Sequence, residues 1–238
     1  MKTTKNMTMK TKQPALPEAR ILVAVPSGST WEADFGMSML AMVANSNIVP
    51  EGYSNISLGV QNTKGSILPQ LRTKLVQKAQ EMNATHILFI DSDMQFPAWT
   101  LHRLLEMKKE VVACNCVTKS LPTVPTARFK DGTLAGTPMR HYDYDGKVDC
   151  IPVWRVGTGV MLIEMGVFDK IGHPYFPITQ LEDEIIGEDW GFCQRCEDAG
   201  IEIFVDVVLS PYIGHVGRLE YTAAMQDMSK SQVVSNPN

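Results

Sequence analysis

The chain has 238 residues, of which 44% are hydrophobic and 20% are charged, with 22 Lys and Arg against 26 Asp and Glu. This composition is that of an ordinary globular protein, and the length suits one large domain or two small ones. The formal net charge of −4 argues against a dedicated nucleic-acid coat protein, which would be basic, but not against an enzyme that touches DNA locally. The five cysteines lack the spacing of a disulfide framework or a zinc site.

The sequence contains no pattern that predicts a membrane span or a secretory signal. No stretch approaches the ~20 apolar residues that span a bilayer. Residues 1–19 carry several lysines but no apolar core, so they are read as a disordered, polar lead-in rather than a secretory signal. We therefore expect a soluble, cytoplasmic protein without a transmembrane segment, in the host cytoplasm if the source is viral.

In the first half of the chain, short continuous runs of apolar residues alternate with segments whose apolar residues have helical spacing. Short apolar runs predict strands, and stripes with helical spacing predict the helices between them. The strands are expected at 20–25, 54–60, 86–90 and 111–114, and the helices at 34–45, 67–82 and 97–109. Such an alternation predicts an α/β fold, a doubly wound and largely parallel sheet flanked by helices.

The second half is more mixed. Residues 118–146 are rich in Pro, Thr, Gly and Tyr, and they contain the turn signals Asp131-Gly132 and Asp145-Gly146. Further strands are expected at 148–155, 160–164 and 201–206, and a helix at 187–199. The acidic stretch with Glu182, Asp183 and Glu184 is either a loop near a site or a solvated surface loop. We expect one Rossmann-like domain over 20–217, with halves 20–117 and 118–217, followed by a tail over 218–238.

The segment His86-Ile-Leu-Phe-Ile-Asp-Ser-Asp93 carries the clearest chemical signal. A buried strand ends in two carboxylates, Asp91 and Asp93, at the edge of the sheet where ligands of α/β proteins bind. Two carboxylates at this spacing can share one divalent cation, and Mg²⁺ or Mn²⁺ is commonly completed by substrate phosphates. The alternative is a polar turn, because Asp favours turns and helix caps.

Two later features extend this signal: Glu188-Asp189 opens a predicted helix, and His215 lies between glycines. Taken alone, the first would be a helix cap and the second a structural histidine. In this order with the D-x-D pair, the chain resembles GT-A-fold glycosyltransferases, family 2 in particular, which use nucleotide sugars. The matching segments are Val23-Ala-Val-Pro26, Leu71-Arg-Thr-Lys-Leu-Val76, Ile87 to Met94, Val156 to Ile163, Gly187-Glu-Asp-Trp190 and Gly214-His215.

The resemblance implies a role for each matching residue. Asp91, Asp93 and His215 would hold Mn²⁺ or Mg²⁺, with Asp93 the more direct ligand, and the metal would stabilise the departing nucleoside diphosphate. Asp189, or less favourably Glu188, would be the general base of an inverting enzyme, a role that disappears in a retaining one.

The remaining roles concern the two substrates. The donor, expected to be a UDP- or GDP-sugar, would meet Pro26, Ser27, Arg72, Asp91 and Ser92, although Arg72 is equally open to being an exposed helix residue. The acceptor would meet Gly157, Thr158, Gly159 and Trp190, and its identity (glycan, protein, small molecule or modified nucleobase) is not specified. Arg218 stands displaced from the position of the usual basic residue after the late histidine.

Two other functions remain as alternatives. A sugar-phosphate nucleotidyltransferase shares the sheet and the acidic ligands, but it should carry a basic, glycine-rich loop after the first strand. The corresponding loop, Pro26-Ser-Gly-Ser-Thr30, has one glycine and no basic residue. A non-catalytic nucleotide-sugar-binding module would have lost a metal ligand, whereas both aspartates and the histidine are present.

Overall fold

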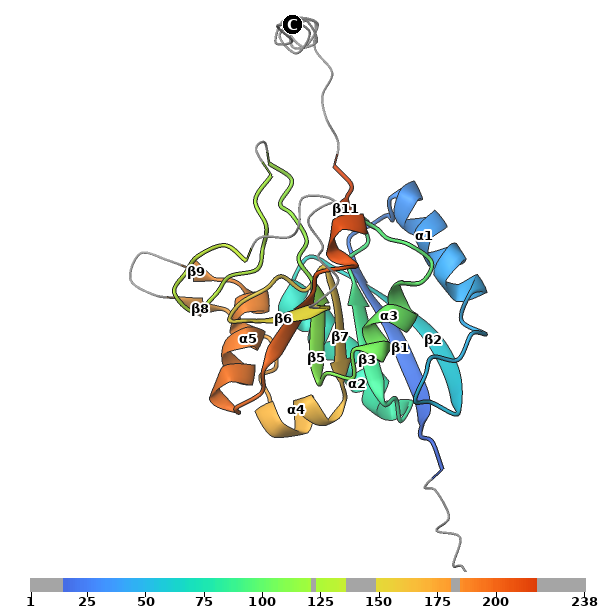
Figure 1. Cartoon of the computed structure of the whole chain (residues 1–238). Helices are drawn as coiled ribbons and strands as arrows, with labels where there is room; N and C mark the ends of the chain where they lie inside the picture. Colours follow the sequence, from blue (N-terminus) through green and yellow to red (C-terminus); the bar gives the residue numbers. More distant parts are fainter. Residues whose placement is uncertain (1–14, 121–122, 136–148, 181–184, 218–238) are drawn as a thin grey trace, which may run out of the picture.

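The computed structural model describes residues 15–120, 123–135, 149–180 and 185–217. They form one central sheet covered by helices on both faces (Figure 1). The seven strands lie in the order β2-β1-β3-β7-β5-β10-β6. Their bounds are β1 Glu18–Ser27, β2 Asn55–Lys64, β3 His86–Ile90, β5 Val111–Cys114, β6 Cys150–Val153, β7 Val160–Glu164 and β10 Ile203–Asp206.

The helices and the smaller strands complete the fold. The helices are α1 Ala33–Ala44, α2 Leu68–Glu81, α3 Thr100–Glu106, α4 Gly166–Ile171 and α5 Glu188–Asp198, with a 3-10 turn at Ser210–Tyr212. Two short antiparallel pairs lie outside the main sheet. They join β4 Met94–Gln95 to β11 Gly214–His215, and β8 Thr179–Gln180 to β9 Ile185–Ile186.

The predicted α/β sheet, mostly parallel and with a mixed second half, is confirmed, and its two antiparallel strands both come from that second half. β1 runs parallel to β2 and β3, and β10 runs parallel to β5. β7 lies between β3 and β5 and is antiparallel to both, and β6 is antiparallel to β10 at the sheet edge. The run Val160 to Ile163 is buried, as its apolar sequence predicts, but burial carries no information about strand direction.

The core consists of two apolar layers, one on each face of the sheet. Along β3, Ile87 and Phe89 belong to the layer under α2, α4 and α5, while Leu88 and Ile90 belong to the layer under α1 and α3. This alternation is the period of two of a strand, and burial on both faces requires the continuous apolar sequence. Each such buried side chain stabilises the fold by about 1.5–3 kcal/mol.

Several boundaries differ from the predicted ones. β1 begins at Glu18, inside the predicted lead-in, and ends at Ser27, so that Pro26 belongs to the strand instead of the following turn. The third helix is shorter than the predicted 97–109, and β10 begins later than residue 201. The exact ends of helices and strands depend on capping and on packing against neighbouring elements. The spacing of apolar residues in the sequence does not locate these ends.

One predicted turn lies within the described residues. Gly132 has a φ of +82°, and its amide donates to the Phe129 carbonyl, so that the Asp131-Gly132 pair turns the chain back on itself. Asp145-Gly146 and the acidic residues 182–184 lie outside the described residues. No helix in the described part of the chain is long and apolar enough to cross a bilayer.

Candidate active site

The D-x-D turn leaves the sheet at the carboxyl end of β3. The Asp91 amide donates to the Gly159 carbonyl at 3.0 Å, and the Met94 amide donates to the Asp91 carbonyl at 3.1 Å. The turn is therefore fixed against the start of β7 before any ligand binds. Because β4 begins directly after the turn and pairs with β11, Met94 lies opposite His215. This short pairing brings the late Gly-His segment to the D-x-D turn.

Asp93, His215 and Lys119 converge at this turn. Asp93 Oδ2 lies 2.5 Å from Lys119 Nζ and 3.5 Å from His215 Nε2. Burial alone would raise the pKa of Asp93, but its contacts with His215 and Lys119 outweigh burial and lower the pKa to about 2. Asp93 is therefore ionised at neutral pH, as a metal ligand must be.

A backbone carbonyl orients the imidazole of His215. His215 Nδ1 lies 2.8 Å from the Val117 carbonyl oxygen, which can only accept, so the nitrogen at this position carries the hydrogen. Nε2 faces Asp93, and its contact with this carboxylate raises the pKa of His215. Histidines that bind metals are held in this way by a second hydrogen bond.

The first aspartate of the motif is held differently, by a buried arginine. Arg72 on α2 is only 2% exposed, and its Nη2 donates to Asp91 Oδ1 at 3.0 Å. Its Nε lies 3.6 Å from Glu188 Oε1, and the guanidinium lies 5.5 Å from the centre of the Phe89 ring. Of the two alternatives left open for Arg72, the exposed helix residue is therefore excluded, because the stripe of α2 that faces the sheet includes position 72.

Arg72 retains unused hydrogen-bonding capacity. Its Nε and Nη1 atoms are buried and have no hydrogen-bond partner among the described residues. Enclosure raises the pKa of Asp91, and the charge of Arg72 partly offsets this effect. Arg72 thus connects the D-x-D turn to the first residue of α5, with donors left over for a ligand or a water molecule.

The start of α5 presents the second pair of carboxylates. Glu188 is its first residue and Asp189 the second, and the Trp190 amide donates to Asp189 Oδ1 at 2.7 Å. Burial raises the pKa of Asp189, an effect that this amide hydrogen bond partly offsets. A carboxylate whose pKa is raised toward neutrality is better matched to accepting a proton from a substrate.

The two glycines of Gly157-Thr158-Gly159 allow neighbouring side chains to pack closely against the backbone. A Cβ on Gly159 would lie 2.3 Å from Met94 Cε, so the missing side chain makes room for the residue that follows the D-x-D turn. A Cβ on Gly157 would lie 3.3 Å from Thr126 Oγ1, and Thr158 is buried. This segment forms the floor beneath the turn. Trp190, predicted beside the acceptor, is half-buried in the first turn of α5.

The end of β1 lies against the same turn. Ser27 is buried, and Asn62 on the neighbouring β2 donates to its Oγ at 2.7 Å. Past Pro26 and Ser27, the chain returns so that the Glu32 amide donates to the Ser92 carbonyl at 3.1 Å. The residues predicted to bind the donor therefore surround one end of the sheet.

The side chains near the D-x-D turn could supply only part of the coordination shell of a divalent cation. Within the described ranges, no three His, Cys, Asp or Glu side chains group closely enough to hold a metal ion by themselves. Asp93 Oδ2 and His215 Nε2 lie 3.5 Å apart, so both could bind one cation. The positively charged ammonium of Lys119 already contacts the same carboxylate oxygen. A site with two protein ligands fits Mg²⁺ or Mn²⁺, which usually keep water and substrate phosphates as further ligands.

Lys119 and Asn62 contact the predicted site residues Asp93 and Ser27, although the sequence did not single them out. Lys119 stands alone in a polar segment after β5, and Asn62 lies inside a strand with an irregular pattern, so neither is set apart by a motif. Both reach the site through contacts between elements that are distant in sequence. Arg218, doubtful from its spacing, lies outside the described residues.

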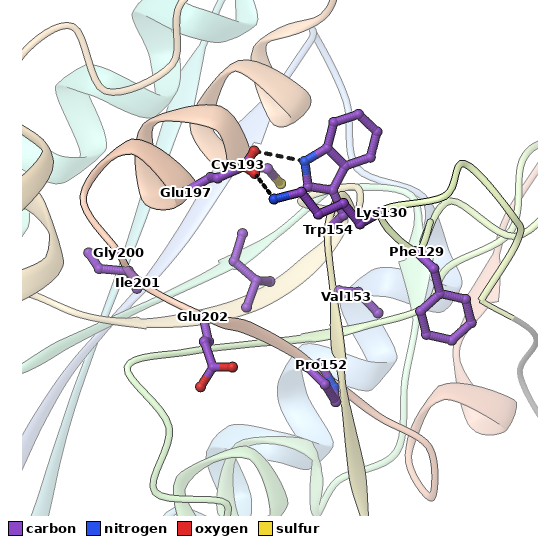
Figure 2. A pocket seen from close by; sticks show the side chains of 11 residues that line it. Phe129, Lys130, Pro152, Val153, Trp154, Cys193, Glu197, Gly200, Ile201 and Glu202 are labelled. Carbon is purple, nitrogen blue, oxygen red and sulfur yellow. Dashed lines mark hydrogen bonds and ion pairs between the residues drawn. The ribbon is translucent and has the colours of Figure 1, made fainter.

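A separate cavity lies near the other end of α5 (Figure 2). It encloses about 460 Å³ between β6, α5 and the segment after it, and Trp154, Phe129 and Ile203 contribute to its walls. Lys130 and Trp154 donate to Glu197 at 2.9 and 2.8 Å, and these hydrogen bonds lower the pKa of Glu197 to about 2. None of the predicted site residues lines this cavity.

Solved structures with a similar fold include glycosyltransferases. GalNAc-T7, in a structure with UDP, GalNAc and Mn²⁺, is 14% identical, with a TM-score of 0.54 over 88% of this chain and 45% of that chain. TarS 1-349 from S. aureus, in complex with UDP-GlcNAc, is 12% identical, with a TM-score of 0.50 over 85% of this chain and 60% of that chain. The chain thus spans less than half of the GalNAc-T7 chain.

A third similar structure is that of A197 from STIV. It is 16% identical, with a TM-score of 0.51 over 85% of this chain and 98% of that chain. No protein-family model matches the chain, and no curated protein matches its sequence. At these identities the likeness concerns the fold, and it establishes a single-domain, GT-A-like α/β architecture for the described residues.

Proposed function

We propose that the protein is a metal-dependent glycosyltransferase that moves a sugar from a nucleoside-diphosphate sugar to an acceptor hydroxyl. The observation that carries this proposal is the Arg72 bridge, which connects Asp91 of the D-x-D turn to Glu188 at the start of α5. Through these two contacts, Arg72 links the turn that carries the proposed metal ligand Asp93 to the helix start that carries the proposed base Asp189, and this reaction needs both parts. The GT-A-like fold supports the proposal, as do the ligands of the two similar glycosyltransferases, which are UDP, GalNAc and Mn²⁺ in one and UDP-GlcNAc in the other.

In the proposed site, Asp93 and His215 hold Mn²⁺ or Mg²⁺. The metal supplies Lewis-acid stabilisation of the negative charge on the leaving nucleoside diphosphate. Asp91 and the Arg72 side chain that holds it would line the donor side of the site, with Pro26, Ser27 and Ser92 along the nucleoside. The donor base is expected to be uracil or guanine.

Asp189 is the proposed general base. Its raised pKa favours proton acceptance, whereas the neighbouring Glu188 lies 3.6 Å from Arg72 and is engaged by that cation. The acceptor hydroxyl would lie between Asp189 and the sugar, over the floor of Gly157, Thr158 and Gly159, with Trp190 beside it. This role belongs to an inverting reaction.

Binding of nucleotides to the folded protein tests the proposal. UDP, GDP and their sugars should raise the midpoint of thermal unfolding in the presence of Mn²⁺ and not in EDTA, because only the folded state binds them. Asp93→Asn should abolish this shift, while Asp198→Asn at the far end of α5 should keep it. A shift that is equal with and without metal, or equal in Asp93→Asn, would contradict the metal-dependent site.

A further inference from the structure

Lys119 occupies a defined position at the edge of the site. Its ammonium lies 2.5 Å from Asp93 Oδ2, and its side chain is 38% exposed. The stem passes Gly217, where an added Cβ would lie 3.5 Å from Lys119 Cδ. The lysine is thus confined between the D-x-D turn and the residues that follow β11.

The segment that carries Lys119 also orients His215. The Val117 carbonyl accepts from His215 Nδ1, and the Thr118 amide donates to the Val124 carbonyl at 2.9 Å. Thr118 Oγ1 in turn accepts from the Val124 amide at 3.2 Å. One braced segment therefore sets the position of both groups that contact Asp93.

Two cations would compete for the same carboxylate oxygen. A metal ion held by Asp93 and His215 must use Asp93 Oδ2, because this atom faces Nε2, and Lys119 Nζ already contacts it. The metal ion and the ammonium, both in contact with one oxygen atom, would repel each other strongly in a partly enclosed site. The ammonium must therefore leave Asp93 Oδ2 when a divalent cation arrives.

We propose that Lys119 is the resident counter-ion of Asp93 in the metal-free protein, and that the metal displaces it onto the phosphate oxygens of the donor. This inference rests on the proposed function. The ammonium has three donors and no acceptor, so once displaced it needs an anion nearby. The diphosphate held by the same metal is that anion, and lysine binds phosphate as a point charge. Lys119 is thus a positioning residue for the leaving group.

In the variant Lys119→Gln, we expect the affinity for Mn²⁺ to rise and the affinity for the nucleoside diphosphate to fall. In Lys119→Gln, Mn²⁺ should bind the nucleotide-free protein about five- to tenfold more tightly, because its competitor at Asp93 is gone. The same variant should bind UDP and GDP about five- to tenfold more weakly at saturating Mn²⁺, because a phosphate contact is lost. Titration calorimetry measures both affinities without catalysis.

Two matched variants sharpen the test. Lys130→Gln removes an exposed lysine that pairs with Glu197 in the separate cavity, and it should change neither affinity. Lys119→Arg keeps the charge and should keep the Mn²⁺ affinity near that of the wild type. A general loss of structure would weaken both ligands together, unlike the opposite changes expected for Lys119→Gln.

The outcomes separate this inference from the proposed function. If the wild type binds Mn²⁺ through Asp93, as loss in Asp93→Asn would show, and Lys119→Gln binds Mn²⁺ with equal or lower affinity, the counter-ion role is wrong while the site stands. Equal nucleotide affinity in Lys119→Gln would overturn the transfer to phosphate. If no form binds Mn²⁺ through Asp93, both the inference and the metal site of the proposed function fail.

Discussion

Arg72 donates a 3.0 Å hydrogen bond to Asp91, although the arginine is almost completely buried within the face of a helix that covers the sheet. A buried arginine is costly unless anions compensate it, and here Asp91 and Glu188 both do so. The pairing therefore ties the stability of α2 to the geometry of the site.

Replacing Arg72 should destabilise the protein through the charges it leaves behind. Arg72→Leu leaves Asp91 and Glu188 without their cation, which we expect to lower the free energy of unfolding by about 3 kcal/mol. Urea denaturation measures this change. The double variant Arg72→Leu with Asp91→Asn should recover part of it, because fewer charges are left unpaired. A single variant within 0.5 kcal/mol of wild type would show that the pairing is not structural.

His86 should make the protein less stable in acid. Burial lowers the pKa of His86 from 6.5 to about 4, so the folded state resists protonation while the unfolded state accepts it. Its contribution to stability is complete above pH 6.5 and is lost as the pH falls toward 4 and below. Between pH 7 and pH 4, wild type should lose up to about 3 kcal/mol more unfolding free energy than His86→Gln. Parallel pH profiles for the two proteins would exclude this role.

Gly191 should not tolerate a side chain. A Cβ at this position in α5 would lie 1.9 Å from the Pro177 carbonyl oxygen, a backbone atom that cannot move alone. We expect Gly191→Ala to cost about 1–3 kcal/mol of stability and to disturb Asp189, two residues earlier in the same turn of α5. Gly166→Ala in α4 is the control, since a Cβ there meets nothing within 4 Å, and it should be neutral or slightly stabilising. Equal effects of the two substitutions would argue against the close contact.

Asp189 should affect turnover more than donor binding. Asp189→Asn keeps the shape of the side chain and its position on α5 but removes the base, so donor hydrolysis by water should slow by about 10²–10⁴-fold. The affinity for the nucleoside diphosphate with Mn²⁺ should stay within about twofold. Release of nucleoside diphosphate from the donor measures the first quantity, and calorimetry the second. Near-normal turnover in this variant would remove Asp189 from the role of base.

The sequence predicted the parts of this fold that local patterns encode. The apolar run of β3, its two aspartates and the alternation of strands and helices are visible in the first half of the chain. The antiparallel insertion of β7 is not, because it depends on how distant strands pair. The same reason explains why Lys119 was missed and Arg72 left undecided. Their contacts, with Asp93 and with Asp91 and Glu188, join elements that only the tertiary fold brings together.

The most direct test of the account is a crystal structure of the protein with Mn²⁺ and a nucleoside diphosphate, using the anomalous signal of manganese. We predict a peak between Asp93 Oδ2 and His215 Nε2, with phosphate oxygens completing the coordination and Lys119 moved from the carboxylate to a phosphate. Nucleotide bound at the carboxyl end of β3 without a manganese peak, or manganese at any other place, would contradict the central claim of a metal-assisted transferase site.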